Sequence, residues 1–118
     1  MRKASLYFFC LFLLAFASCR SGFEKIRTSS DPALILKAAD KYYDEKSYIK
    51  AQTLYEQILT SFRGQKEAEI IYFKYAYTHY YLNQFDLSSH LFKTFANTFI
   101  NSDKKEEADF MSVYSLYK

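Results

Sequence analysis

Residues 32–68 have the sequence PALILKAADKYYDEKSYIKAQTLYEQILTSFRGQKEA, and residues 69–105, EIIYFKYAYTHYYLNQFDLSSHLFKTFANTFINSDKK, repeat its pattern. When Ala39 is aligned with Ala76, three further pairs coincide: Tyr48 with Phe85, Tyr55 with Phe92 and Ile58 with Phe95. A third copy, residues 106–118, aligns Val113, Tyr114 and Tyr117 with Ala76, Tyr77 and Tyr80. A period of 37 residues predicts a solenoid of stacked helical units.

Each unit is predicted to hold two helices. In the first unit, Ile35, Ala39 and Tyr42 recur at helical spacing, Pro32 suits a first turn, and Ser30 or Asp31 suits the N-cap. The expected helices span residues 32–43, 48–62, 66–82 and 85–99, with a further helix from about residue 106. The expected connections are the polar turns 44–47, 83–84 and 101–103, and a stop at Gly64.

Composition narrows the class of fold. The chain has 118 residues, only two glycines, one proline, no tryptophan, and 24 tyrosines and phenylalanines together. This leaves little material for hairpin turns or glycine-rich phosphate loops, so helices joined by short polar turns are favoured. Without Arg2 and Lys3 the balance is 14 basic against 13 acidic residues, which gives no basic field for nucleic acid.

The N-terminus has the order of a secretory signal. Arg2 and Lys3 precede a 12-residue apolar run, residues 6–17, which is too short to span a hydrocarbon core. Residues 16–19, Phe-Ala-Ser-Cys, resemble the lipobox of bacterial lipoproteins, apart from Phe16 in place of the usual Leu. The resemblance implies cleavage after residue 18 and acylation of Cys19; the alternative is an ordinary signal peptide with a chance cysteine. Residues 1–18 are therefore expected to be a signal peptide, and 19–31 a lipidated tether.

The repeat resembles the tetratricopeptide repeat, with a small residue and an aromatic in the first helix and the same order in the second. The matching residues are Ala39, Tyr42, Ala51 and Tyr55 in the first unit, and Ala76, His79, Ser88 and Phe92 in the second. The period departs from the usual 34 residues, and residues 63–65 have the character of an insertion. The resemblance implies an all-α, right-handed solenoid of antiparallel helix pairs with repeats 32–68, 69–105 and a partial 106–118, and the chain is expected to be truncated in this third repeat.

A lipobox, a short tether and aromatic-rich repeats together resemble the BamD family of outer-membrane β-barrel assembly lipoproteins, most closely versions from the Bacteroidetes. Stretches 48–64, 67–81 and 106–117 carry the likeness. It implies a lipid-anchored scaffold on the periplasmic face of the outer membrane, whose partners are the barrel insertase and unfolded outer-membrane proteins. Two alternatives stay open: an envelope or secretin-assembly adaptor of similar architecture, and a glycan-binding uptake lipoprotein, a class that is longer and usually carries tryptophan platforms.

The candidate binding site is an aromatic stripe on the first helices of the units. Its predicted groove residues are Phe73, Tyr77, Tyr80, Tyr81, Phe110, Tyr114 and Tyr117, with a more polar end at Leu36, Asp40, Tyr43 and Asp44. Tyrosine suits a peptide-binding surface because it offers apolar area and a hydroxyl group, although any of these rings could instead pack between helices.

No enzyme, metal or cofactor is expected. His79 takes the place of Tyr42 in the repeat, which predicts a packed core residue, and His90 is predicted on the polar face of a helix. No cysteine or carboxylate cluster joins the two histidines into a metal site. The acidic residues 106, 107 and 109 begin a helix, where they would offset its dipole.

Overall fold

The computed structural model describes residues 2–4, 7 and 22–118. Within 22–118 the chain is all-helical, with the order α2 (Gly22–Arg27), α3 (Pro32–Asp44), α4 (Tyr48–Ile58), α5 (Glu67–Tyr81), α6 (Phe85–Thr98), α7 (Lys105–Tyr114) and the 3₁₀ turn η1 (Ser115–Tyr117). The predicted signal peptide and Cys19 lie outside the described residues, except for residues 2–4 and 7.

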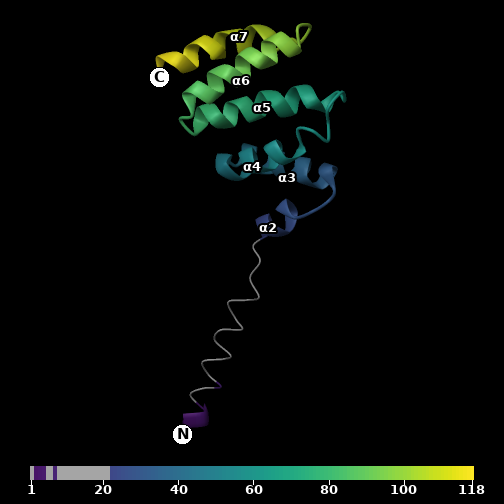
Figure 1. The fold of residues 1–118 in the computed structure, drawn as a ribbon, viewed down its shortest axis with the longest axis vertical. Coiled ribbons are helices and arrows are strands. Elements are labelled where there is room, and N and C mark those ends of the chain that lie inside the picture. Colours follow the sequence, from purple (N-terminus) through teal and green to yellow (C-terminus); the bar gives the residue numbers. More distant parts are fainter. Residues whose placement is uncertain (1, 5–6, 8–21) are drawn as a thin grey trace.

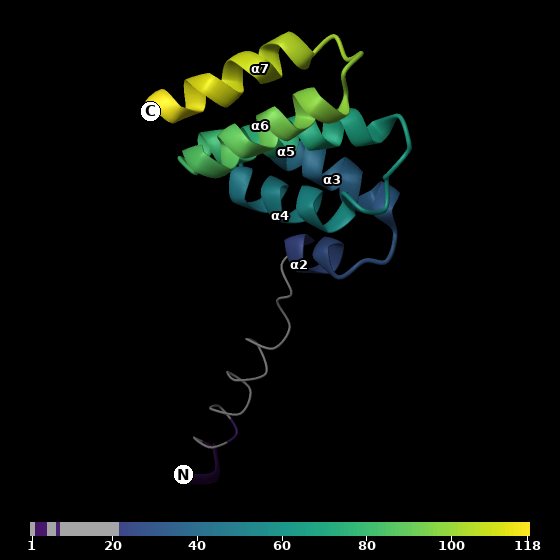
Figure 2. The same cartoon turned by 45° about the horizontal axis from the view of Figure 1, so that its top comes forward.

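The helices pack in chain order, each mainly against its neighbours in sequence. Two helical hairpins, α3–α4 and α5–α6, are stacked side by side, and α7 covers the second hairpin at the end of the stack opposite α2 (Figure 1; Figure 2). This arrangement confirms the predicted class, an all-α helical-repeat solenoid.

Two core clusters hold the stack together. One lies between α3, α4 and α5 and includes Tyr55 and Leu54; the other lies between α5, α6 and α7 and includes Phe92 and Phe95. Helix α5 contributes to both, with Ile71 in the first cluster and residues such as Phe73 in the second. Because α5 is covered on two sides, its sequence is apolar all round instead of having one apolar stripe.

The turn between the two helices of a hairpin has the same geometry in both units. The backbone N–H of Ser47 donates to the carbonyl oxygen of Tyr42 (2.8 Å), and that of Gln84 donates to His79 (2.9 Å). The residues before them, Lys46 and Asn83, have left-handed backbone conformations with φ of 62° and 60°. These are Schellman-type helix ends, and they lie 37 residues apart, as the repeat requires.

Helix α4 ends at Ile58, four residues before the predicted end at residue 62. Beyond it the backbone N–H of Ser61 donates to Ile58, and that of Arg63 donates to Thr60, so the chain continues in tight turns. Gly64, with φ of 80°, lies within this connection and does not directly end the helix. The apolar pattern misplaced the boundary because Leu59 and Phe62 still pack against the core from the turns.

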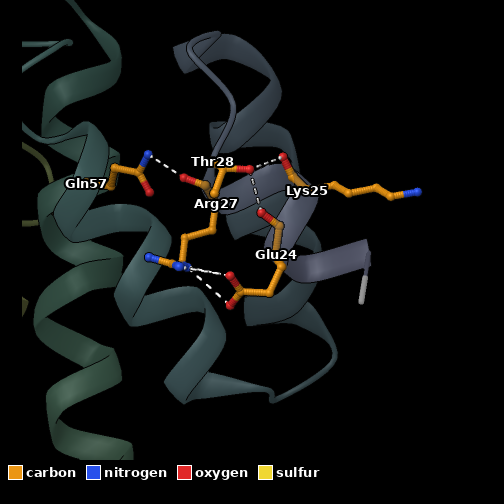
Figure 3. Close-up of polar contacts among 5 residues, drawn as sticks. All are labelled: Glu24, Lys25, Arg27, Thr28 and Gln57. Carbon is orange, nitrogen blue, oxygen red and sulfur yellow. Dashed lines mark hydrogen bonds and ion pairs between the residues drawn. The ribbon is translucent and has the colours of Figure 1, made fainter. Parts of the chain in front are cut away.

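Part of the expected tether is structured. Helix α2 packs through Phe23 and Ile26 against the first core cluster. The Phe23 ring contacts Tyr42 edge-on at 5.7 Å, and Lys50 lies over the Phe23 ring at the same distance. In Figure 3 the side chain of Gln57 donates to the backbone oxygen of Arg27 (2.9 Å), which ties α2 to α4. The sequence pattern missed this helix because it has only six residues.

The same helix is fastened internally by polar contacts (Figure 3). Arg27 pairs with Glu24 one turn earlier at 2.8 Å, and the hydroxyl of Thr28 donates to the carbonyl oxygen of Glu24 at 2.8 Å. These exposed contacts add little stability on their own, so the packing of Phe23 and Ile26 is what docks the segment.

Candidate binding surface

A continuous row of aromatic rings crosses the boundaries between the units. We call it the tyrosine stripe; its members are Tyr43 of α3, Tyr48 of α4, Tyr77, Tyr80 and Tyr81 of α5, and Phe110 and Tyr114 of α7. The Tyr81 ring stacks on Tyr48 at 4.4 Å and on Tyr77 at 5.7 Å. Tyr80 contacts Tyr114 at 6.1 Å, and Tyr114 stacks on Phe110 at 5.3 Å. The stripe therefore connects all three repeats through ring contacts.

The helix ends explain why these rings meet. Tyr43, Tyr80 and Tyr117 are equivalent positions; Tyr43 and Tyr80 lie in the last turns of α3 and α5, and Tyr117 lies in the 3₁₀ turn η1 after α7. Within a unit, the ring at this position contacts the first ring of the second helix: Tyr43 contacts Tyr48, and Tyr80 contacts Phe85, each at 5.7 Å. The repeat thus places one contacting pair of aromatic rings at the turn of each hairpin.

A partly buried polar network supports the α3 end of the stripe, in which the Asp40 side chain is 42% exposed and the Lys74 side chain 25% exposed. The hydroxyl of Tyr55, which is fully buried, donates to Asp40 (2.6 Å), and Lys74 pairs with the same carboxylate oxygen (3.0 Å). The Lys74 ammonium group also lies over the ring of Tyr43, 5.4 Å from its centre. Asp40 and Lys74 belong to different repeats, so this network fixes the relative position of two units.

Tyrosine hydroxyls in this region are held in the protonated state. Burial is the main cause that raises the pKa of Tyr43, Tyr55 and Tyr77 well above its ordinary value. For Tyr55 the hydrogen bond to Asp40 adds to this effect, and for Tyr77 the hydrogen bond to Glu107 of α7 does so. A raised pKa keeps these groups neutral hydrogen-bond donors at physiological pH.

The structure places the predicted groove residues at different depths. Phe73 is buried and packs edge-on against Phe92 at 5.9 Å, so it forms part of the core between α5 and α6. Tyr77 and Tyr80 are half-buried. The exposed members are Tyr81 (46%), Phe110 (61%), Tyr114 (37%) and Tyr117 (83%). A ligand in solution could therefore reach Tyr81 and the residues of α7, while the other rings support them.

Tyr48 is the member of the stripe that the sequence reasoning missed. It begins the second helix of its unit, and second helices were assigned away from the groove. The alignment of Tyr48 with Phe85 showed that Tyr48 belongs to the repeat. It did not predict that the Tyr48 ring stacks on Tyr81.

The two histidines lie as predicted. His79 is buried, with its ring edge-on to Tyr75 at 4.8 Å, and His90 is exposed on α6. Among residues 2–4, 7 and 22–118 no group of three histidine, cysteine, aspartate or glutamate side chains could hold a metal ion. Over the same residues no helix is both long and apolar enough to cross a membrane.

A cavity of about 670 Å³ lies at the opposite ends of the helices from Tyr81. It is bounded by the end of α4, the connection 59–66, the start of α5 and the end of α6. Leu59, Tyr72 and Phe99 give it apolar walls, and Glu56 and Arg63 supply charge. None of the residues that line it belongs to the tyrosine stripe, so we treat the two as separate features.

Comparison of the chain with protein-family models, with curated proteins and with solved structures finds no match. The class that the fold defines is a helical-repeat protein of sequentially packed helix pairs.

Proposed function

We propose that this chain is a lipid-anchored periplasmic scaffold subunit of the outer-membrane β-barrel assembly machinery. In this role it binds unfolded barrel proteins and partner subunits through its helical repeats, on the periplasmic face of the outer membrane. The observation that carries the proposal is the tyrosine stripe, a partly exposed aromatic surface that runs across successive repeats.

The chemistry of the stripe suits unfolded barrel segments. Outward-facing residues of a transmembrane β-barrel are apolar, with aromatic girdles at both interfaces, so an unfolded segment presents apolar side chains that alternate with polar ones and aromatic side chains near the strand ends. Exposed rings such as Tyr81 offer stacking area and a hydroxyl donor, and lose little rotamer entropy on binding. Asp40 and Lys74 lie beside Tyr43 and add a polar, hydrogen-bonding end.

The N-terminal sequence supports the location. Two or three acyl chains on Cys19 would hold the chain to a membrane firmly, whereas a single chain would give only marginal attachment. Residue 20 is Arg and not Asp, which in lipoproteins resembling the enterobacterial kind allows transport to the outer membrane.

The experiment is affinity capture of the full-length lipoprotein from detergent-solubilised membranes, followed by identification of the proteins retained. Recovery of the barrel insertase is the expected result. Recovery of secretin components without the insertase would replace the proposal with the alternative, an envelope or secretin-assembly adaptor built on the same repeats. The same capture is repeated with the double variant Tyr81→Ala/Tyr114→Ala, which removes two exposed rings. It shows whether retention of the partner proteins depends on the tyrosine stripe.

A further inference from the structure

Cys19, the proposed acylation site, lies close in sequence to the first docked helix. Helix α2 begins at Gly22, so only residues 19–21 separate the anchor from a helix that packs on the stack. Three residues reach at most about 10 Å, whereas the whole tether expected from the sequence, residues 19–31, would reach about 45 Å. With Cys19 acylated, the start of α2 therefore stays within about 10 Å of the membrane surface.

Contacts of Phe23, the second residue of α2, show which part of the stack is held nearest the anchor. The Phe23 ring lies 5.7 Å from the ring of Tyr42, and the ammonium group of Lys50 lies over it at the same distance. Tyr42 and Lys50 lie on either side of the first hairpin turn. The hydrogen bond from Gln57 to the backbone of Arg27 holds the other end of α2 (Figure 3). The start of α2 is thus fixed beside the turn of the first hairpin.

The surface at this turn is apolar at its centre and basic at its edges. Ile49 is 70% exposed, and Lys46 and Lys50 on either side of it in sequence are also exposed. Together with Leu82 they border a shallow hollow of about 270 Å³, which no acidic residue of the described chain lines. Neither lysine forms an ion pair within residues 22–118. We call Lys46, Ile49 and Lys50 the Ile49 patch.

The internal repeat shows that this composition belongs to the hairpin next to the anchor. The second hairpin has no lysine at the equivalent positions, and an acidic residue replaces the isoleucine. Its residues there are Asn83, Asp86 and Leu87. In the first turn itself, Glu45 pairs with Lys41 at 4.0 Å, and the N-terminus of α4 adds the positive end of a helix dipole. The first hairpin therefore presents a basic and apolar surface that the second lacks.

We infer that the Ile49 patch rests on the phospholipid headgroups of the membrane that holds Cys19. The inference rests on the acylation of Cys19 in the proposed function. The Ile49 side chain enters the boundary between headgroups and acyl chains, and Lys46 and Lys50 place ammonium groups near lipid phosphates. The lysine stems can lie along the apolar boundary while their charged ends stay in water.

This contact sets the position of the tyrosine stripe relative to the membrane. Tyr48 belongs to the stripe and lies between Lys46 and Ile49 in sequence, and its ring stacks on Tyr81 of the second hairpin at 4.4 Å. The stripe therefore begins at the membrane surface and continues along the stack to α7. A chain bound along the stripe then has one end beside the bilayer.

The test compares how close two matched positions come to lipid. The acylated full-length protein carries Ile49→Cys or Ile100→Cys, labelled with the fluorophore NBD, in vesicles of phosphatidylethanolamine and phosphatidylglycerol. Both positions are exposed isoleucines, but Ile100 follows α6 at the far end from the hairpin turns. Lipids with a nitroxide on the headgroup should quench the label at position 49 strongly and the label at position 100 weakly. Equal quenching at the two positions would overturn the inference.

A second comparison separates binding by the Ile49 patch from closeness imposed by the short tether. A flexible glycine-serine insert between residues 21 and 22 lets the stack leave the surface. Quenching at position 49 should persist with the insert on vesicles that contain phosphatidylglycerol. Adding Lys46→Gln and Lys50→Gln should reduce it severalfold, because each lysine near an anionic surface contributes roughly fivefold in affinity. Loss of quenching in the lengthened chain with both lysines intact would count against the patch.

The matched control is the lengthened chain with Lys66→Gln and Lys93→Gln, two exposed lysines outside the patch, which should keep its quenching. Circular dichroism confirms that each variant keeps its helices. Mass spectrometry of the purified protein separates the possible failures. An unacylated Cys19 would overturn the proposed lipid anchor and the inference with it, whereas an acylated protein with an unquenched label at position 49 would overturn the inference alone.

Discussion

At the scale of single residues, the structure shows which aromatic side chains are packed in the core and which are exposed to solvent. Tyr55 and Phe73 are both aromatic and both lie at helical spacing, yet they are core residues, while Tyr81 and Tyr117 are exposed. The sequence predicted that His79 would be packed and that the aromatic positions would repeat. It could not predict which side of each ring a neighbouring helix covers, because that depends on how the hairpins are stacked.

Tyr55→Phe should lower the free energy of unfolding by about 1–2 kcal/mol, because it removes a partly buried hydrogen bond to a carboxylate. Asp40 keeps its ion pair with Lys74, which limits the loss. Urea denaturation of the chain from residue 20 onward measures the change. Tyr117→Phe, at an exposed ring, is the control and should stay within about 0.5 kcal/mol. An equal loss in both variants would show that the Asp40 network contributes nothing specific.

His79 should make stability depend on pH. Burial lowers the pKa of His79 below its ordinary value of 6.5, against a weaker opposing effect of the Gln84 side chain and of Glu56. The unfolded chain then binds the proton more readily, so the stabilising contribution is full above about pH 6.5 and is lost as the pH falls toward the lower folded pKa. The unfolding midpoint should drop between pH 7.5 and 5.5.

His79→Phe is expected to flatten that part of the pH profile, because a phenyl ring keeps the packing against Tyr75 and binds no proton. His90→Gln removes an exposed imidazole and should leave the slope as in the wild type. If the wild-type slope survives in His79→Phe, other groups cause it.

Cys19→Ser tests the anchor. If Cys19 is acylated, the variant should lose membrane attachment while its folding is unchanged, because residue 19 precedes the first helix of the stack, α2, which begins at Gly22. It should appear in the soluble periplasmic fraction, or remain uncleaved and held by its apolar segment. Metabolic labelling with a fatty-acid analogue distinguishes the cases: label in the wild type that vanishes in the variant is expected, and an unlabelled wild type cut by ordinary signal peptidase would contradict lipidation.

At the scale of elements, the turns between helices repeat with the 37-residue period, as the helices do. Both hairpin turns use a left-handed residue at equivalent positions, Lys46 and Asn83, although neither is glycine. The sequence predicted the polar turns but not this conformation, since lysine gives no local sign of it. The sequence pattern also failed to predict where α4 ends and that α2 forms. Both features depend on packing against residues that are distant in the sequence.

Lys46→Gly should stabilise the chain by roughly 0.5–1 kcal/mol. A left-handed conformation costs a lysine about 1–2 kcal/mol, and glycine relieves this strain at a smaller entropic cost. Asn83→Gly should gain less, because asparagine already tolerates this conformation. Thermal melting of the two variants beside the wild type checks the order. A loss of stability in Lys46→Gly would contradict this expectation. It would show that the contacts of the Lys46 side chain stabilise the fold by more than the backbone strain destabilises it.

At the scale of the whole molecule, the 37-residue period predicted the fold class and the order of the hairpins. It predicted the candidate site only in part: the structure joins the aromatic positions into one stripe through Tyr48 and Tyr81, which belong to different units. Tyr81 of α5 is exposed and can be probed separately from Phe110 and Tyr114 of α7.

The most direct test of the proposed scaffold role is site-specific photocrosslinking at Tyr81 in intact cells. Tyr81 is replaced by benzoylphenylalanine, which preserves an exposed aromatic ring on the stripe. On irradiation it should form adducts with precursors of outer-membrane barrel proteins. The same replacement at Ile49, exposed on α4 and outside the stripe, should form none. Adducts of equal yield at both positions, or adducts at Tyr81 that contain no barrel protein, would contradict the account.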